Sequence, residues 1–197
     1  MTGVLLFCTA EDAKPLIRKV MHNTNDKGEL LHSSFYLIQG NDLPDDSDEL
    51  KSRLTQEETF TSVFIGASEQ NCRDWMLEKQ KQVNYVEINI FAIADAESVK
   101  DNTLLVQFYY PEFDPPLSPM EFPGYGILPP RTNAWYSYRI QHDQFDDLHA
   151  ALCYLAPDIR YPIYFGRKAE LTDEQGIFDV ARADGIIAGK EPFTPPA

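Results

Sequence analysis

The residues best suited to covalent chemistry are the cysteines and histidines, and their spacing gives this chemistry little support. The sequence has three cysteines, Cys8, Cys72 and Cys153. His149 and Cys153 lie four residues apart in a predicted helix, so that their side chains could share one face. A catalytic thiol also needs a depressed pKa and a nearby base. Neighbouring core and boundary positions produce the same spacing, and whether Cys153 and His149 are more than structural stays open.

Known metal and phosphate motifs are not matched either. The acidic loop at residues 45–49 has a calcium-like composition, but Lys51 stands where an EF-hand loop needs glycine. The turn after the first predicted strand, at residues 7–12, has no glycine and carries two acids where a phosphate would bind. We therefore expect no metal site and no cofactor. No helical i, i+4 pair occurs among the histidines, which are His22, His32, His142 and His149.

A proline-rich segment with many aromatic neighbours is the remaining candidate for a site. Seven of the fourteen prolines lie between Pro111 and Pro130, which opposes regular elements there. The segment is also rich in apolar side chains, which argues against disorder and favours packing on the body of the protein. Residues 111–131 are therefore predicted to form an ordered flap over an α/β domain. The predicted ligand- or partner-binding residues are Tyr110, Glu112, Tyr125, Arg131, Trp135 and Tyr138. The alternative is that these rings only cover the sheet.

Arg131 has two possible roles in such a flap. Pro129 and Pro130 stiffen the chain before it. Its guanidinium could pair with Glu112 or Asp114 and pin the flap, or it could receive a carboxylate or phosphate of a ligand. We favour the pinning role at this stage.

The elements that position these residues alternate between strands and helices. Strands are predicted at residues 4–8, 34–39, 61–66, 84–95, 102–110, 133–141 and 161–165. Helices are predicted after residue 12 and at residues 49–54, 69–83 and 144–155, with a terminal helix from the capping box at residues 172–175. Alternation of this kind indicates an α/β layered fold with a mixed, largely parallel central sheet flanked by helices.

One strand carries the clearest pattern. In residues 84–95 apolar side chains recur at every second position on one face of an extended chain, and the other face becomes apolar from Phe91 onward. The strand should therefore begin with one face exposed and end buried on both faces. The face that is apolar throughout is predicted to hold Val86, Ile88, Ile90, Ala92 and Ala94.

Length and charge set the remaining expectations. A chain of 197 residues suits one α/β domain at residues 1–190, followed by a frayed tail at residues 191–197. The net charge of -14 and the lack of a basic patch argue against nucleic acid and anionic membranes as partners. A protein or small-molecule ligand suits this negative field better, and a basic one suits it best. The oligomeric state is not predicted.

Localisation is inferred from the cysteines and the first residues. The few cysteines have no metal-like spacing, which favours reduced thiols. The apolar run at residues 4–8 is too short for a secretory signal, and no stretch is long enough to cross a membrane. We expect a soluble, cytoplasmic protein.

The order of motifs in the middle of the chain resembles a small domain family of unknown function. The resemblance covers roughly residues 61–155. It is carried by a strand and a capped helix, paired strands around Ala94-Asp-Ala-Glu and Leu104-Leu-Val, then Leu128-Pro-Pro-Arg131 and Gln144-Phe-Asp-Asp-Leu148. It implies one shared domain, and it implies no activity because that family has none assigned.

These observations predict a binding or interaction module that uses the aromatic flap. The alternative is a small-molecule enzyme with its pocket under the same flap. In that case Arg131 would orient an anionic group, with a carboxylate or histidine as the base, and the catalytic residues are otherwise unknown. Tyr125 and Trp135 would wall the pocket in either case.

Overall fold

The computed structural model describes residues 2–112 and 118–193, and the chain divides into two compact units. Unit 1 ends at Phe108 and unit 2 begins at Tyr109. Residues 113–117 of the expected flap and residues 194–197 of the expected tail lie outside the described residues. That residues 1–190 form a single domain stays a prediction.

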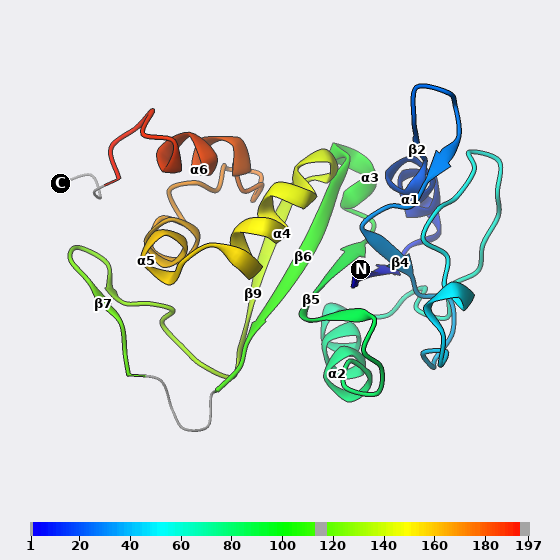
Figure 1. Ribbon diagram of the computed structural model, residues 1–197, viewed down its shortest axis with the longest axis horizontal. Coiled ribbons are helices and arrows are strands. Elements are labelled where there is room, and N and C mark those ends of the chain that lie inside the picture. Colours follow the sequence, from blue (N-terminus) through cyan, green and yellow to red (C-terminus); the bar gives the residue numbers. More distant parts are fainter. Residues whose placement is uncertain (1, 113–117, 194–197) are drawn as a thin grey trace. The chain divides into compact units, whose positions relative to one another are not determined.

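Unit 1 is built on a mixed sheet whose strands run in the order β4-β1-β5-β6 (Figure 1). Strand β1 (Gly3–Cys8) is parallel both to β4 (Phe35–Leu37) and to β5 (Val86–Ala94). Strand β5 is antiparallel to β6 (Thr103–Tyr110), which crosses the boundary between the units. The predicted α/β layered fold with a mixed, largely parallel sheet and flanking helices is confirmed.

The connections of unit 1 place helices on both faces of this sheet. The chain leaves β1 through η1 (Glu11–Ala13) and α1 (Lys14–Met21) and returns to β4 on one side of β1. It then passes through α2 (Glu69–Lys79) to β5 on the other side of β1. Right-handed crossovers in opposite directions put α1 and α2 on opposite faces, as Figure 1 shows. Strand β1 is consequently buried along its whole length.

The carboxyl end of β1 is covered by the chain itself. Residues 61–66, predicted as a strand, form turns instead, so that prediction is wrong. Ser62 Oγ donates to the carbonyl of Cys8 (2.9 Å), and the Gly66 N–H donates to the carbonyl of Thr9 (2.8 Å). In doubly wound sheets this edge is where ligands bind. Here these turns use the carbonyls at the end of β1 as their hydrogen-bond acceptors.

Strand β5 does not alternate regularly, because Asn89 has a φ of 68° and the register against β1 shifts in this region. Ile88 is 54% exposed whereas Ile90 is fully buried, so the prediction that the two share a buried face is wrong. The Asn89 N–H donates to Oε1 of Gln80 at 2.8 Å, and Gln80 is itself 2% exposed. A buried side chain therefore satisfies the backbone group that the irregular strand leaves without a ladder partner.

The other elements of unit 1 are short. Strands β2 (Asn23–Thr24) and β3 (Leu30–Leu31) form an antiparallel pair, and α3 (Ser98–Asp101) links β5 to β6. The helix predicted at residues 49–54 is wrong: only a 3₁₀ turn, η2 (Ser47–Glu49), forms, and Asp46 caps it.

Unit 2 combines a small hairpin, one long strand and several helices. The hairpin pairs β7 (Glu121–Phe122) with β8 (Gly126–Ile127) within the proline-rich segment. Strand β9 (Ala134–Gln141) is followed by η3 (His142–Gln144) and α4 (Phe145–Tyr154), close to their predicted positions.

Two sequence predictions fail further along unit 2. After α5 (Pro157–Arg160), residues predicted as a strand form a π-helix, η4 (Tyr161–Gly166), which is one of the rarer backbone conformations. The last helix, α6 (Val180–Ile187), begins after Asp179 rather than at the capping box at residues 172–175. Within the described ranges, no helix has the length and apolar character needed to cross a bilayer.

The Gln80–Asn89 hydrogen bond gives a stability prediction for unit 1. Gln80→Met keeps the volume but removes the acceptor of the half-buried Asn89 N–H, so the free energy of unfolding should fall by about 1 kcal/mol. Urea denaturation followed by circular dichroism measures this. Gln82→Met is the matched control, because Gln82 is exposed. Equal effects of the two substitutions would contradict the role given to Gln80.

Candidate functional site

A pocket of about 490 Å³ lies within unit 2, along the proline-rich segment. This volume is within the range of about 300–1,000 Å³ that is usual for small-molecule sites. Its apolar wall is formed by Pro119, Met120, Ile127, Leu128, Pro129 and Pro130. Its polar groups come from Tyr110, Glu112, Ser118, Arg131, Thr132 and Tyr161. An apolar wall with a few polar groups is the usual composition of a ligand site.

Three of the six predicted site residues, Tyr110, Glu112 and Arg131, line this pocket. Tyr161 lines it too, although sequence reasoning did not select it. Its ring lies 5.5 Å from that of Phe165, four residues later. That helical spacing was present in the sequence, but the continuous apolar run around it suggested a strand.

The other three predicted residues lie elsewhere in unit 2. Tyr125 Oη donates to the carbonyl of Phe193 (3.0 Å). Trp135 lies with its ring 5.0 Å from that of Tyr109. Tyr138 is 1% exposed and donates to the carbonyl of Tyr164 (2.7 Å). None of the three is among the described residues that line the pocket.

Arg131 is held by its backbone. Tyr136 Oη accepts from the Arg131 N–H (3.0 Å) and donates to the Arg131 carbonyl (2.8 Å), so one hydroxyl satisfies both groups. Burial raises the pKa of Tyr136, which keeps the phenol protonated and able to donate. Among the residues that the structure describes, no hydrogen bond or ion pair engages the Arg131 guanidinium. The side chain is thus anchored at its base, while its tip has no partner among residues 2–112 and 118–193.

Glu112 is held by Asn133 and not by Arg131. Asn133 Nδ2 donates to Glu112 Oε2 (3.0 Å), while Asn133 Oδ1 accepts from the Glu112 N–H (3.2 Å) and from Tyr109 Oη (2.9 Å). The pinning ion pair expected between Arg131 and Glu112 is not formed. Asp114, the other expected partner, lies outside the described residues.

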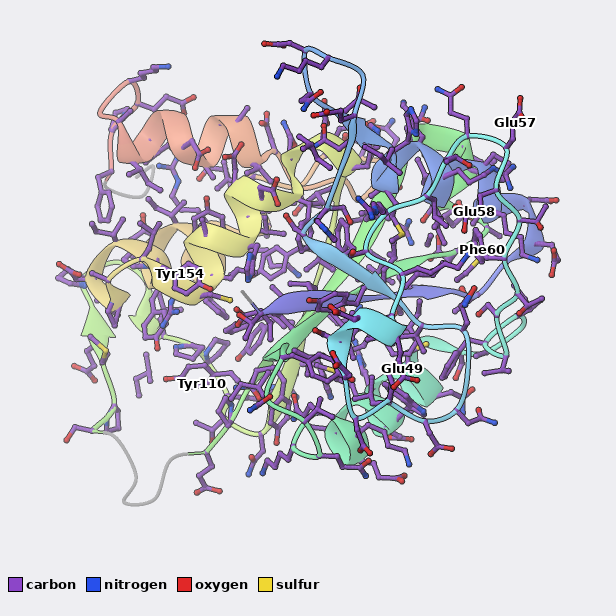
Figure 2. All side chains as sticks on the ribbon, turned by 45° about the vertical axis from the view of Figure 1, so that its right-hand side comes forward. Glu49, Glu57, Glu58, Phe60, Tyr110 and Tyr154 are labelled. Carbon is purple, nitrogen blue, oxygen red and sulfur yellow. The ribbon has the colours of Figure 1, made fainter. Side chains whose placement is uncertain are left out.

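The inner wall of the pocket carries a pair of tyrosine hydroxyls. Tyr110 Oη lies 2.8 Å from Tyr161 Oη, and Figure 2 labels Tyr110 in unit 2. Burial raises the pKa of Tyr110, and the hydrogen bond to Tyr161 adds to the effect, so the Tyr110 hydroxyl stays protonated at neutral pH. Arg160 Nη2 donates to Tyr161 Oη (3.2 Å), and the Arg160 guanidinium carbon lies 4.8 Å from the centre of the Tyr161 ring.

The π-helix η4 positions Tyr161. One side is fixed by Tyr164, whose hydroxyl donates to Asp184 Oδ1 of α6 (3.2 Å). At the other end a Cβ at Gly166 would collide with the ring of Tyr125, so the hairpin can rest on this helix only because residue 166 has no side chain. The hairpin side and the tyrosine side of the pocket therefore meet at η4.

A second cavity, of about 690 Å³, lies in unit 1. Several of its charged and polar groups already have partners within unit 1. Lys51 pairs with Glu58, which is labelled in Figure 2. His32 Nδ1 lies 2.6 Å from Ser52 Oγ, and Arg53 donates to a backbone carbonyl. A ligand there would have to replace bonds already made, so the pocket of unit 2 is the better candidate.

The thiols and possible metal ligands add no second site. Burial raises the pKa of Cys8 to about 11 and that of Cys72 to about 12, so both are protonated at neutral pH. Cys153 is half-buried, and the ring of His149 stacks on Phe145 at 5.7 Å. Within residues 2–112 and 118–193, no group of three or more His, Cys, Asp or Glu side chains is arranged to hold a metal ion.

Comparisons with protein-family models, with curated proteins and with solved structures give no match for this chain. The resemblance of residues 61–155 to a small domain family is therefore neither supported nor opposed by them.

The Asn133 hydrogen bonds give a prediction that needs no ligand. Asn133→Gly tolerates the φ of 50° at this position but loses the amide, so the free energy of unfolding should fall by ~1 kcal/mol and the Glu112 amide should exchange faster. Hydrogen exchange and thermal denaturation measure both effects. Asn102→Gly, at a φ of 55°, is the matched control and should show neither.

Asp184 gives a prediction on pH. Burial raises its pKa, and the charge of Asp147 adds to this, so the ionised form disfavours the native state. Its contribution to stability is present below the unfolded pKa and is lost as the pH rises through the folded value. Asp184→Asn should therefore raise the melting temperature at pH 7, with a gain that shrinks towards pH 3. The exposed Asp26→Asn is the control, and a pH-independent gain would contradict the assignment.

Proposed function

We propose that this chain is a binding module whose ligand site is the pocket of unit 2. The supporting observation is the combination of an apolar wall with polar groups that are fixed before any ligand arrives. Tyr136 fixes the backbone of Arg131, and Asn133 fixes Glu112. A site whose groups are already ordered loses less conformational entropy on binding. A small molecule with a substantial apolar part suits the volume and the wall.

An enzyme that uses the same pocket is the second candidate. Arg131 would orient an anionic group of the substrate, and Glu112 is the carboxylate that lines the pocket and could act as a base. Two observations favour binding over catalysis. The Glu112 carboxylate already accepts a hydrogen bond from Asn133, so one of its two oxygens is engaged within the protein. The described lining contains no histidine.

The wider setting of the module is also a proposal. The cysteine spacing, which favours reduced thiols, supports a cytoplasmic location. Nucleic acid and anionic membranes are unfavourable partners because the net charge of -14 repels both phosphate-rich surfaces. The family resemblance of residues 61–155 remains an expectation and supplies no activity.

The proposal predicts saturable binding of an uncharged apolar probe. N-phenyl-1-naphthylamine should bind with one-to-one stoichiometry and increase in fluorescence. Ile127→Ser should weaken this binding about threefold or more, because it removes an apolar contact from the pocket wall. Ile88→Ser is the matched control, since the two isoleucines are 50% and 54% exposed and only Ile127 lines the pocket. Equal losses in the two variants, or binding that does not saturate, would refute the proposed site.

A further inference from the structure

We infer that the pocket of unit 2 selects molecules with an apolar body and one anionic group, a carboxylate or sulfonate, which Arg131 receives. The inference rests on the proposed function and adds the chemical class of the ligand.

The first support is the way in which Arg131 is presented. Pro130 precedes it, and both of its backbone polar groups are bound to the single hydroxyl of Tyr136. The guanidinium itself has no hydrogen bond or ion pair to the described residues, although it lines the pocket. A planar guanidinium can donate two parallel hydrogen bonds to one carboxylate. Because the backbone is already ordered, a ligand has only the side chain left to immobilise.

The second support is a cation behind the tyrosine wall. The Arg160 guanidinium donates to Tyr161 Oη and to the carbonyl of Leu152, and in the described part of the chain no carboxylate pairs with it. Its charge extends to the pocket, where it lowers the pKa of Tyr110 against the larger effect of burial. The hydroxyl wall therefore lies in the field of a positive charge, which favours an anion nearby.

Glu112 opposes this selection and makes it testable. Its carboxylate lines the pocket and is bound by the amide of Asn133, which is a neutral donor. The negative charge of Glu112 is therefore not neutralised by this bond and should weaken the binding of an anion. Removing that charge should strengthen binding of an anion, whereas removing the charge of Arg131 should weaken it.

The net charge of -14 does not by itself decide which ligand binds in the pocket. Interactions between exposed charges are largely screened beyond about 8 Å at physiological ionic strength. A ligand inside the pocket is governed by the groups that line it. The overall charge should slow the approach of an anion more than it weakens the bound state.

The experiment compares two probes that differ by one charged group. 1-Anilinonaphthalene-8-sulfonate and N-phenyl-1-naphthylamine share the same ring system, and only the first carries a sulfonate. Both are titrated into the full chain by fluorescence. Decanoate and 1-decanol then serve as competitors, to test whether a carboxylate is accepted as the sulfonate is.

Three variants separate the contributions. Arg131→Met keeps the apolar stem and removes the charge, so it should weaken sulfonate binding by about tenfold or more and change binding of the neutral probe less than about twofold. Glu112→Gln should strengthen sulfonate binding only. Arg18→Met, which removes an arginine in α1 of unit 1, is the control and should change neither. Decanoate should displace the sulfonate probe from the wild type more effectively than 1-decanol.

The outcomes distinguish the two proposals. Failure of both probes to bind saturably would refute the proposed function itself. Saturable binding of the neutral probe, with equal losses for both probes in Arg131→Met, would overturn the anion inference and leave the pocket standing.

Thermal denaturation of the same variants supplies an independent readout. Arg131→Met should leave the melting temperature unchanged or raise it, because it removes a cation that forms no ion pair with the described residues. A fall in Arg131→Met that is matched by an equal fall in Asp114→Asn would show that the two residues pin the flap together, and this result would also overturn the inference.

Discussion

The candidate site depends on the hydrogen bonds that join Glu112 to Asn133. Twenty-one positions separate these residues in the sequence, and the Asn133 amide binds both the backbone and the carboxylate of Glu112. Closing a loop of this length costs conformational entropy that the loop's own contacts must offset. With its ends held together, the proline-rich chain can present one face to Tyr110 and Tyr161. The Asn133 amide thus closes the segment, while Tyr136 and the π-helix η4 fix the other groups of the pocket.

Unit 1 shows why a ligand site is not found where such sheets usually have one. Strand β1 lies between two parallel neighbours, and the connections on its two sides place their helices on opposite faces of the sheet. In such sheets the carboxyl end of the strand where this reversal occurs is the usual ligand site. Here Phe64 is buried, and its ring lies 4.8 Å from that of Phe7. The turns at residues 61–66 also bind the carbonyls at the end of the strand. An aromatic contact and backbone hydrogen bonds hold the chain where a ligand would otherwise sit, and the edge has become part of the core.

The sequence was informative where local pattern decides structure. Alternation of apolar runs predicted the α/β layers. Arg131 was selected from the sequence and does line a pocket, but the ion pair with Glu112 that was expected for it is not formed. Prediction from the sequence failed where contacts between residues distant in the sequence decide the structure. Ile88 is exposed where Asn89 adopts a positive φ and the register against β1 shifts, and Gln80, nine positions earlier in the sequence, binds the backbone N–H there. Tyr161 was missed because a π-helix and a short buried strand have similar apolar composition. The role of Tyr136 could not be predicted either, because a phenol that hydrogen-bonds to backbone groups does not constrain the side chain of the residue it binds.

That last contact affects how such a site can evolve. Tyr136 recognises the peptide groups of residue 131 and makes no demand on its side chain. Selection for the shape of the loop therefore acts on position 136, while position 131 is free to drift. Exchange of the arginine for a neutral or acidic residue would redirect the pocket to a different ligand without rebuilding the loop. Related chains that share the tyrosine and differ at position 131 would then form a set of binding modules with one architecture and divergent specificities.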